Sequence, residues 1–267
     1  MGLRKALLHT LHASPRFRGR DRLMGAIAQT FATRPVRLPG GLLMDLDPYE
    51  WIQLEILIRG ATEPFTLQLM RQLVEEGDVV IDVGAHVGHH ALIAALAAGA
   101  TGSVYAFDPQ PYNVDRIARN AAHNGLVNVV AVCAAVGAKN AFIRIPAQSQ
   151  RDRARLSLSA PGPNDLAAFV EVPLRRLDSY IDDNRLQAPK LVKIDVEGYE
   201  PEVLRGLGER LKECRNIILE VLEDADPGKT REVVQLLTTN NFSLRDVHGQ
   251  PWRAGLPLVE CNLWAAH

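Results

Sequence analysis

Short apolar runs alternate with segments of helical periodicity along most of this chain. The run at residues 79–83 reads Val-Val-Ile-Asp-Val, and its β-branched residues predict a strand that is buried on both faces. We expect seven strands in the main sheet, at residues 79–83, 104–107, 129–132, 191–194, 217–221, 244–247 and 259–264. We expect helices at residues 64–76, 91–98, 112–124, 200–212 and 230–240, and extra strands at 142–145 and 170–172 around a polar loop. This alternation predicts an α/β fold with a mostly parallel seven-stranded sheet and helices on both faces.

The first 62 residues lack this alternation. Ser14 and Pro15 interrupt a helical pattern that runs to about residue 35, and residues 36–47 predict a short hairpin with its turn at Pro39, Gly40 and Gly41. Residues 50–58 are again helical in pattern. We therefore expect a helical and hairpin extension at residues 1–62, which could cover a substrate, and a catalytic α/β domain at residues 63–267.

A glycine-rich loop follows the first strand of the main sheet. Asp82, Gly84 and Gly88 form the pattern Asp-x-Gly-x-x-x-Gly, in which the glycines allow a tight turn and a close approach to a ligand. Ligands of open α/β sheets bind at the carboxyl ends of the strands. The helix after the loop offers unpaired N–H groups to a carboxylate. Asp108 ends the next strand, where an acidic side chain can accept hydrogen bonds from both ribose hydroxyls.

Two classes of cofactor compete for such a loop. A dinucleotide site requires Gly-x-Gly-x-x-Gly, because a pyrophosphate packs against bare backbone, but His86 stands where the second glycine would fall. A P-loop is excluded because no Gly-Lys-Ser/Thr follows. S-adenosylmethionine (SAM) carries no phosphate and needs a loop for its methionine and an acid for its ribose. The pattern favours SAM and leaves a nicotinamide-dependent oxidoreductase as the alternative.

Six segments carry a resemblance to a known family. They read Val-Ile-Asp-Val-Gly-Ala-His-Val-Gly at residues 80–88, Ala-Phe-Asp-Pro-Gln-Pro-Tyr-Asn at 106–113, Arg-Asn at 119–120 with Asn-Gly at 124–125, Ala-Ala-Val-Gly at 134–137, Leu-Arg-Arg-Leu-Asp at 174–178, and Lys-Ile-Asp-Val-Glu-Gly-Tyr-Glu at 193–200. Across roughly residues 63–221 the chain resembles the FkbM-type methyltransferases. That family commonly has Asn at the position of His86 and Glu at the position of Asp108, so this chain departs from the family at two loop positions.

The resemblance implies a Rossmann-like class I methyltransferase fold, SAM as the methyl donor, and O-methylation of a hydroxyl on a sugar, glycan or natural product. A non-enzymatic partner of the same fold in a biosynthetic complex is a further alternative. The loop pattern and the resemblance together predict the cofactor-binding residues Glu63, Asp82, Gly84, Ala85, His86, Gly88, Asp108, Pro109, Asn113, Ala135 and Asp195.

Three acids follow strand ends at the same edge of the predicted sheet. Asp195 and Glu197 come after the strand at residues 191–194, and Glu220 lies near the end of the strand at 217–221. A carboxylate there could accept the proton of an acceptor hydroxyl, so we predict all three as catalytic residues. The alternatives for Asp195 and Glu197 are capping of the next helix and, for Asp195, an ion pair with Lys193 on the same sheet face.

Composition narrows the range of partners. The formal net charge of −1 does not favour nucleic-acid binding, so the expected acceptor is a small molecule or a glycan. The apolar run at residues 91–98 is too short to span a bilayer, although the basic first 37 residues would allow peripheral membrane contact. Three widely spaced cysteines are typical of a cytoplasmic protein. His86, His89 and His90 have a metal-like spacing without a matching carboxylate, so no metal site is predicted.

Overall fold

The computed structural model describes residues 35–48, 50–146, 169–221 and 227–267, together with Leu7, Thr10, Leu11, Ser14, Leu23, Ala26 and Ile27. The helical break expected at Ser14 and Pro15 and the polar loop expected between residues 146 and 169 therefore lie largely outside the described residues. The chain divides into two compact units. The first comprises Met1–Thr62, Ala122–Gly125 and Pro146–Val170, and the second comprises Glu63–Ala121, Leu126–Ile145 and Glu171–His267.

The first unit contains the expected hairpin and the helix that follows it. β1 (Val36–Arg37) pairs antiparallel with β2 (Leu43–Met44), which confirms the hairpin. α3 (Trp51–Arg59) begins after Glu50, whose carboxylate accepts hydrogen bonds from two backbone N–H groups of the first turn. The helix ends at Gly60, which has a φ of 91° and so adopts the left-handed conformation common at helix ends.

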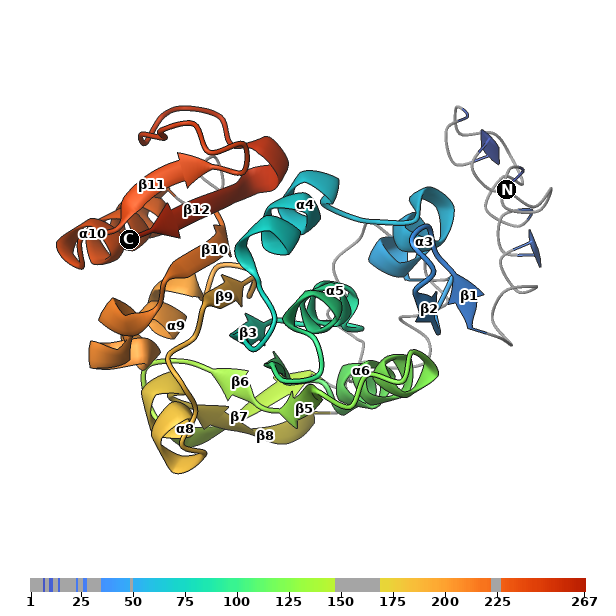
Figure 1. The fold of residues 1–267 in the computed structure, drawn as a ribbon, viewed down its shortest axis with the longest axis horizontal. Coiled ribbons are helices and arrows are strands. Elements are labelled where there is room, and N and C mark those ends of the chain that lie inside the picture. Colours follow the sequence, from blue (N-terminus) through green and yellow to red (C-terminus); the bar gives the residue numbers. More distant parts are fainter. Residues whose placement is uncertain are drawn as a thin grey trace. The chain divides into compact units, whose positions relative to one another are not determined.

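A seven-stranded sheet forms the centre of the second unit (Figure 1). Its strands lie in the order β11 (Ser243–Asp246), β12 (Asn262–Ala266), β10 (Asn216–Glu220), β9 (Leu191–Ile194), β3 (Val79–Val83), β4 (Ser103–Asp108) and β5 (Val129–Cys133). β10, β9, β3, β4 and β5 are parallel, and β12 runs antiparallel to both of its neighbours. The predicted α/β class and mostly parallel seven-stranded sheet are therefore confirmed.

Helices cover both faces of this sheet. α4 (Pro64–Leu73), α5 (His89–Ala98) and α6 (Pro111–His123) pack on the face that carries Val80 and Ile218. α8 (Leu177–Asp183), α9 (Glu200–Leu207) and α10 (Pro227–Thr239) pack on the face that carries Ile81 and Ile217. Neighbouring residues of one strand thus enter two different cores, which explains why the strands lack alternation in sequence.

Several element boundaries differ from the expectation. α4 ends at Leu73, before residue 76, because Val74 is already extended. The helix expected at residues 200–212 changes at Gly208 into a 3₁₀ helix, η1 (Gly208–Glu213). A second 3₁₀ turn, η2 (Val259–Cys261), precedes β12, so the last strand begins three residues later than expected.

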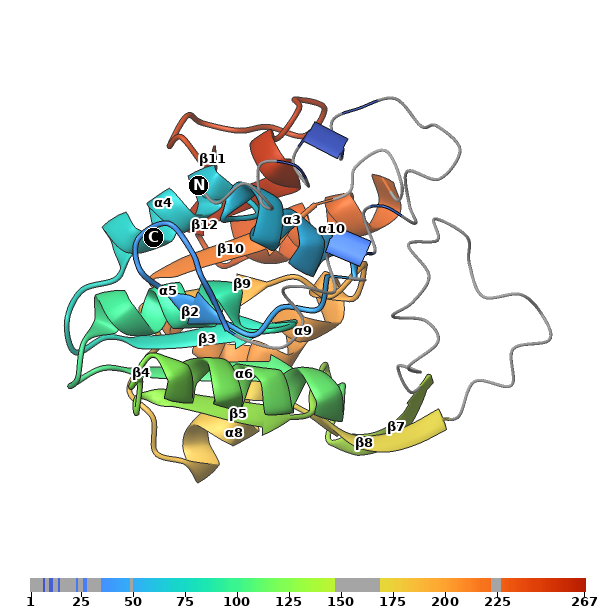
Figure 2. The same cartoon turned by 90° about the vertical axis from the view of Figure 1, so that its right-hand side faces the viewer.

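The two extra strands belong to a separate sheet. They are β7 (Ala141–Pro146) and β8 (Phe169–Arg175), and they form a three-stranded sheet with β6 (Ala135–Val136) in the order β6-β8-β7. Figure 2 shows β7 and β8 extending away from α8. Neither β6 nor α8 was expected, because both are too short to show a clear period.

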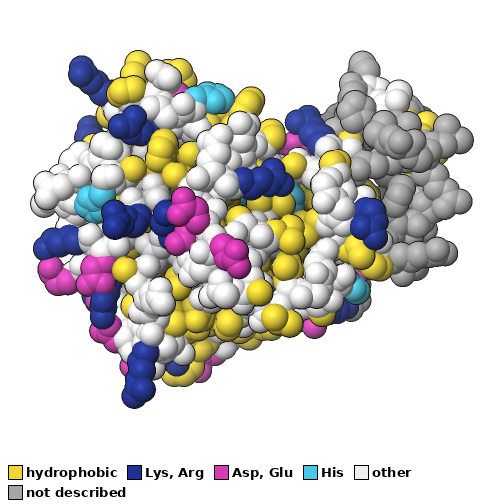
Figure 3. Space-filling view, viewed as in Figure 1, with side chains coloured by type: hydrophobic (Ala, Val, Ile, Leu, Met, Phe, Trp, Pro, Cys, Tyr) yellow, Lys and Arg dark blue, Asp and Glu magenta, His cyan; other side chains and the backbone are white. Residues whose placement is uncertain are grey.

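No described helix is both long enough and apolar enough to cross a membrane. On the face drawn in Figure 3, basic and acidic side chains are mixed over the described part of the protein. The basic residues between positions 4 and 34, on which peripheral membrane contact was predicted, lie outside the described residues.

Candidate active site

The loop after β3 turns through three residues with positive φ. Gly84 has a φ of 83°, and a Cβ there would lie 1.7 Å from the backbone oxygen of Asp195, so no side chain fits. Gly88 has a φ of 87° and would place a Cβ 3.2 Å from Cγ1 of Ile117. His86, between them, has a φ of 52°, which non-glycine residues rarely adopt. The glycines therefore let the loop pack tightly against the end of β9 and against α6.

Asp108 ends β4 and organises the loops around it. Its Oδ2 accepts a hydrogen bond from His86 N at 3.0 Å, and its Oδ1 accepts from Gln110 N at 2.8 Å and from Asn113 Nδ2 at 3.1 Å. Burial raises the pKa of Asp108, and these donors offset that rise only in part. A carboxylate has about four acceptor positions, so about one remains for a ligand.

The other predicted cofactor residues lie along the same edge or next to it. Backbone N–H groups of Gly84 and Ala85 both donate to the oxygen of Phe107 at 2.9 Å, which fixes the loop to the end of β4. Pro109 follows Asp108 directly. Ala135 begins β6, two residues beyond the end of β5, where its Cα pairs with that of Leu174.

A buried lysine lies among carboxylates on the sheet face beneath α4 and α5. Lys193 is 1% exposed, and its Nζ lies 2.9 Å from Asp195 Oδ2, so the ion pair considered from the sequence is present. Burial lowers the pKa of Lys193, but the carboxylates of Asp195, Glu63 and Asp82 outweigh burial and raise that pKa above its usual value. Lys193 therefore stays protonated.

Asp82 lies directly opposite Lys193 in the register of β3 and β9. It is fully buried, and neither of its carboxylate oxygens has a hydrogen-bond partner among the described residues. Burial raises the pKa of Asp82, and Lys193 offsets that rise only in part. A buried carboxylate without a donor is costly unless a ligand supplies one.

Glu63 enters the same cluster from the start of α4. Its Oε2 lies 3.3 Å from His90 Nε2 and accepts a hydrogen bond from Asn262 Nδ2 at 3.0 Å. Burial raises the pKa of Glu63, but the neighbouring His90, Lys193 and Asn262 outweigh burial and bring it to about 2. Glu63 is therefore ionised at neutral pH.

Asp195, Glu197 and Glu220 converge at the carboxyl edge of the sheet. One carboxylate oxygen from each lies within 4.8 Å of the others, close enough to hold a divalent cation, a site that the histidine spacing did not indicate. Burial raises the pKa of Glu220, and the carboxylates of Asp195 and Glu197 raise it further, to about 7. Burial and Asp195 also raise the pKa of Glu197.

Neither Asp195 nor Glu197 occupies the N-cap position of α9, which is Tyr199. Glu200 accepts hydrogen bonds from Gly198 N at 2.9 Å and from Val196 N at 3.3 Å, and so serves the N–H groups ahead of α9. Asp195 pairs with Lys193 instead. Glu197 has a φ of 54°, a strained conformation of the kind that gathers at functional sites.

The other histidines have separate environments. His89 is 5% exposed, and burial lowers its pKa to about 3, so it is neutral. His248 lies in the turn after β11, as expected, with its ring centroid 4.7 Å from that of Phe65.

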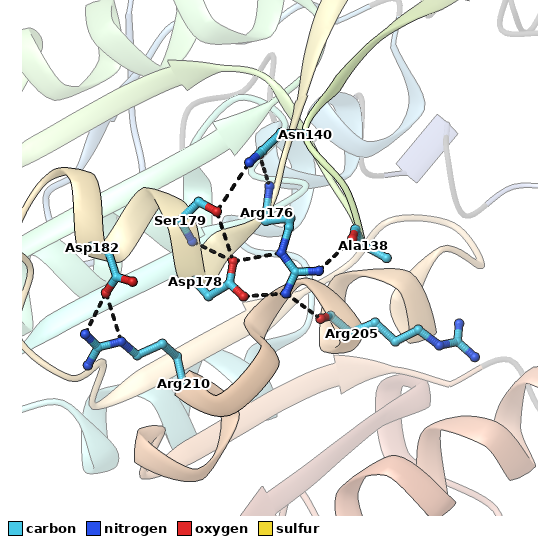
Figure 4. Close-up of polar contacts among 8 residues, drawn as sticks. All are labelled: Ala138, Asn140, Arg176, Asp178, Ser179, Asp182, Arg205 and Arg210. Atoms are coloured by element: carbon cyan, nitrogen blue, oxygen red, sulfur yellow. Dashed lines mark hydrogen bonds and ion pairs between the residues drawn. The ribbon is translucent and has the colours of Figure 1, made fainter.

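Arg176 and Asp178 of the Leu-Arg-Arg-Leu-Asp segment form a network of hydrogen bonds with neighbouring loops (Figure 4). Arg176 Nε donates to Asp178 Oδ1 at 2.9 Å, and Arg176 Nη1 donates to Ala138 O at 2.6 Å. Arg176 N donates to Asn140 Oδ1 at 2.9 Å, and Asp178 Oδ1 also accepts from Ser179 N at 2.6 Å. These bonds tie the turn between β6 and β7 to the first turn of α8.

Comparison with known proteins identifies the family. A family model described as the methyltransferase FkbM domain matches residues 82–244, more than half of the chain. The chain belongs to the FkbM methyltransferase family. It is 26% identical over 183 residues, 68% of this chain and 70% of the relative, to the hexuronic acid methyltransferase AglP of Haloferax volcanii.

The solved structures that match this chain share little sequence with it. Methyltransferase FkbM from Methylobacillus flagellatus is 16% identical, with a TM-score of 0.46, and the match covers 93% of this chain and 60% of that one. A putative rRNA-methylase from Clostridium thermocellum is 15% identical, with a TM-score of 0.46, and the match covers 75% of this chain and 90% of that one.

Membership of the FkbM family decides between the cofactor classes that the sequence left open. The protein is a SAM-dependent methyltransferase with the predicted Rossmann-like class I fold, and the nicotinamide alternative is not supported. The described residues fit SAM, which carries a positive ammonium and a positive sulfonium. Asp82 offers two buried oxygens without donors, Glu63 is ionised, and Asp108 retains about one acceptor position for a ribose hydroxyl.

Proposed function

We propose that this FkbM-family enzyme transfers the methyl group of SAM to a hydroxyl of a sugar, glycan or natural product, with Glu220 as the general base. The observation that carries the proposal is the carboxyl group of Glu220, which lies beside Asp195 and Glu197 at the carboxyl edge of the sheet and has a pKa of about 7. A general base works best when its pKa lies near the working pH, because it is then both ionised and sufficiently basic.

SAM supplies a methyl group already activated by the sulfonium, so the protein's task is binding, orientation and proton removal. We propose that Glu63 and Asp82 bind the ammonium of the methionine moiety and that Asp108 binds the ribose. We propose that Asp195, which pairs with Lys193, and Glu197 beside it lie where the cofactor meets the acceptor. The remaining proposed contacts to the cofactor come from Gly84, Ala85, His86, Gly88, Pro109, Asn113 and Ala135.

The name of the relative AglP points to an acidic sugar, which offers two kinds of oxygen nucleophile. A carboxylate is already ionised at neutral pH and needs no base, whereas a hydroxyl must lose its proton. The carboxylates of Asp195 and Glu197 would repel an anionic nucleophile. A base with a pKa of about 7 would assist only the hydroxyl, so we propose an ether as the product in preference to an ester.

The division of the chain after Thr62 supports a further part of the proposal. We propose that residues 1–62 shape the acceptor pocket, while residues 63–267 form the methyltransferase domain. We also propose that the enzyme acts in the cytoplasm, because its three cysteines are all free thiols, as is usual in a reducing compartment.

The test uses SAM with a labelled methyl group and four acceptors: a hexuronic acid, the corresponding neutral hexose, and a glycoside of each. Labelled products are then treated with mild alkali, which hydrolyses a methyl ester and leaves a methyl ether intact. We expect alkali-stable label, and we expect Glu220→Gln to lower turnover by about 10²–10⁴-fold.

The exposed Glu209, whose carboxylate pairs with Lys212 on the surface, provides the control variant Glu209→Gln. This control should methylate at the parental rate. Label that alkali releases would contradict the hydroxyl assignment, and a Glu220→Gln protein as active as the control would remove Glu220 as the base. Failure to label any of these acceptors, with SAM bound, would contradict the proposed class of acceptor.

A further inference from the structure

The start of α4 is held by residues from the far end of the chain. The carboxylate of Glu260 accepts hydrogen bonds from Phe65 N at 3.0 Å, from Thr66 N at 2.9 Å and from Thr66 Oγ1 at 2.8 Å. Asn262 is 2% exposed and donates through Nδ2 to Glu63 Oε2 and to Thr66 Oγ1, both at 3.0 Å. The turn before β12 and the first residue of β12 therefore fix the entry into α4.

Glu260 takes the role that normally belongs to the residue preceding a helix. Phe65 and Thr66 are the second and third residues of α4, and their N–H groups are the ones that an N-cap side chain usually binds. The N-cap position is Glu63, yet its side chain makes no capping bond. Because Glu260 serves those N–H groups, the carboxylate of Glu63 is released from capping and lies beside His90.

The backbone on both sides of this contact is strained. Glu63 has φ 48° and ψ 57°, Glu260 has φ 56° and ψ 22°, and Cys261 has a φ of 54°. All three lie in the left-handed region that residues other than glycine rarely enter. Such conformations persist where the surrounding structure fixes them, and they gather at ligand sites. The strain is therefore consistent with a contact whose purpose is to orient a side chain.

We propose that Glu260 and Asn262 are positioning residues for the methionine end of SAM, because they cap α4 in place of Glu63 and thereby present the Glu63 carboxylate to the ammonium group. This inference rests on the proposed contact between Glu63 and the cofactor. All three residues lie outside the segment 82–244 that the family model matches. The cofactor site thus extends to the helix that precedes the first strand of the sheet and to the last strand.

The chain offers a matched control for this chemistry. Glu50 is the N-cap of α3, and its carboxylate accepts hydrogen bonds from Ile52 N at 3.0 Å and from Gln53 N at 2.9 Å. These are again the second and third N–H groups of a helix. Glu50→Gln therefore weakens a helix cap of the same geometry at a helix whose N-cap residue has no proposed contact with SAM.

Two ligands separate positioning from plain stabilisation. S-adenosylhomocysteine and 5′-methylthioadenosine share the adenosine and the thioether, but only the first carries the amino-acid end. Calorimetry should show that Glu260→Gln lowers the affinity for S-adenosylhomocysteine about ten-fold and leaves the affinity for 5′-methylthioadenosine little changed. Glu63→Gln should lower the ratio of the two affinities in the same way. Glu50→Gln should lower the melting temperature without altering the ratio.

Thr66→Val provides a second variant if Glu260→Gln does not fold. It keeps the shape of a residue that is fully buried and removes one hydrogen bond from each of Glu260 and Asn262. This variant should also lower the affinity ratio, by a smaller factor than Glu63→Gln.

Each remaining outcome overturns a distinct part of the argument. If Glu260→Gln and Thr66→Val lower the affinities for both ligands equally, the capping contact only stabilises the fold. A lowered ratio in Glu63→Gln alone would keep the Glu63 contact and refute the positioning role. An unchanged ratio in Glu63→Gln would refute the Glu63 contact itself, and the inference with it, without touching the assignment of Glu220 as the base.

Discussion

Replacing Glu220 with Gln should change the pH dependence of both stability and catalysis. A solvated Glu has a pKa of about 4.3, whereas burial and the carboxylates of Asp195 and Glu197 raise the pKa of Glu220 in the folded protein to about 7. A tenfold change in proton affinity is worth about 1.4 kcal/mol, so the unscreened cost of ionising Glu220 is about 3–4 kcal/mol. Because this side chain is only partly buried, solvent screening reduces the expected cost to about 1–3 kcal/mol.

The direction in which stability changes with pH follows from the raised pKa of Glu220. The unfolded chain releases the Glu220 proton near pH 4, while the folded protein keeps it until about pH 7. Wild-type stability therefore falls between these values and stays lower above them. The glutamine of Glu220→Gln cannot ionise. The free energy of unfolding of this variant should therefore exceed that of the wild type by about 1–3 kcal/mol above pH 7 and equal it near pH 4.

Urea unfolding at about pH 4 and about pH 8 measures this difference, with the exposed Glu209→Gln as the control. In parallel, kcat/KM of the wild type should rise through about pH 7 as Glu220 ionises, and the corresponding profile of Glu220→Gln should be low and lack that rise. A stability difference that is the same at both pH values would refute the raised pKa. A wild-type profile that stays flat around pH 7 would refute the assignment of Glu220 as the base.

Four further replacements test the cofactor loop and the acidic edge. Asp108→Ala should weaken SAM binding about ten-fold or more by calorimetry, and an unchanged affinity in a folded variant would reject the ribose contact. Gly84→Val should abolish SAM binding and lower the melting temperature, because its Cβ would collide with the backbone oxygen of Asp195; parental SAM binding would show that the loop is misassigned. Asp195→Asn and Glu197→Gln should each lower turnover or SAM affinity more than melting temperature, and variants that melt lower but methylate normally would leave both residues a structural role only.

Much of the fold was predictable because local pattern and tertiary environment agree. The apolar run of β3 needs burial on both faces, and the sheet provides it. The predicted helix at residues 200–212 was wrong in its second half for a reason that no local pattern contains. At Gly208, where α9 ends with a φ of 51°, a Cβ would lie 2.5 Å from Oδ2 of Asp178, a residue thirty positions earlier in the chain.

The candidate site was predictable only where strand ends define it. Asp195 and Glu220 lie together because β9 and β10 are adjacent and parallel, and the alternation of elements had indicated the parallel direction. The capping of α4 by Glu260 joins residues about two hundred positions apart, and Glu260 follows no helical or strand period. Sequence spacing cannot reveal such a contact, because it depends on where the last strand enters the sheet.

The buried charge of Lys193 leads to the last prediction. Its Nζ faces Asp195 at 2.9 Å, with the carboxylates of Asp82 and Glu63 also close enough to raise its pKa. Lys193→Met keeps the length and apolar stem of the side chain but leaves these carboxylates without their cation. Removing one partner of a buried ion pair lowers the free energy of unfolding by about 3–5 kcal/mol. We expect Lys193→Met to lower it by that amount near pH 7 and by less near pH 5, where carboxylates take up protons more readily.

Lys190 supplies the control, since its Nζ lies 3.6 Å from Glu75 and 3.8 Å from Asp78 in pairs that solvent reaches. Lys190→Met should lower the free energy of unfolding by no more than about 1 kcal/mol. The double variant Lys193→Met/Asp195→Asn should lose less stability than the sum of its single changes. Lys193→Met leaves the Asp195 carboxylate without its cation, and Asp195→Asn removes that negative charge. If Lys193→Met unfolds at the same urea concentration as Lys190→Met, the buried carboxylates do not depend on Lys193. That result would mean that Asp82, whose oxygens have no hydrogen-bond donor among the described residues, is protonated in the folded protein and does not serve as an anionic partner for the ammonium of SAM.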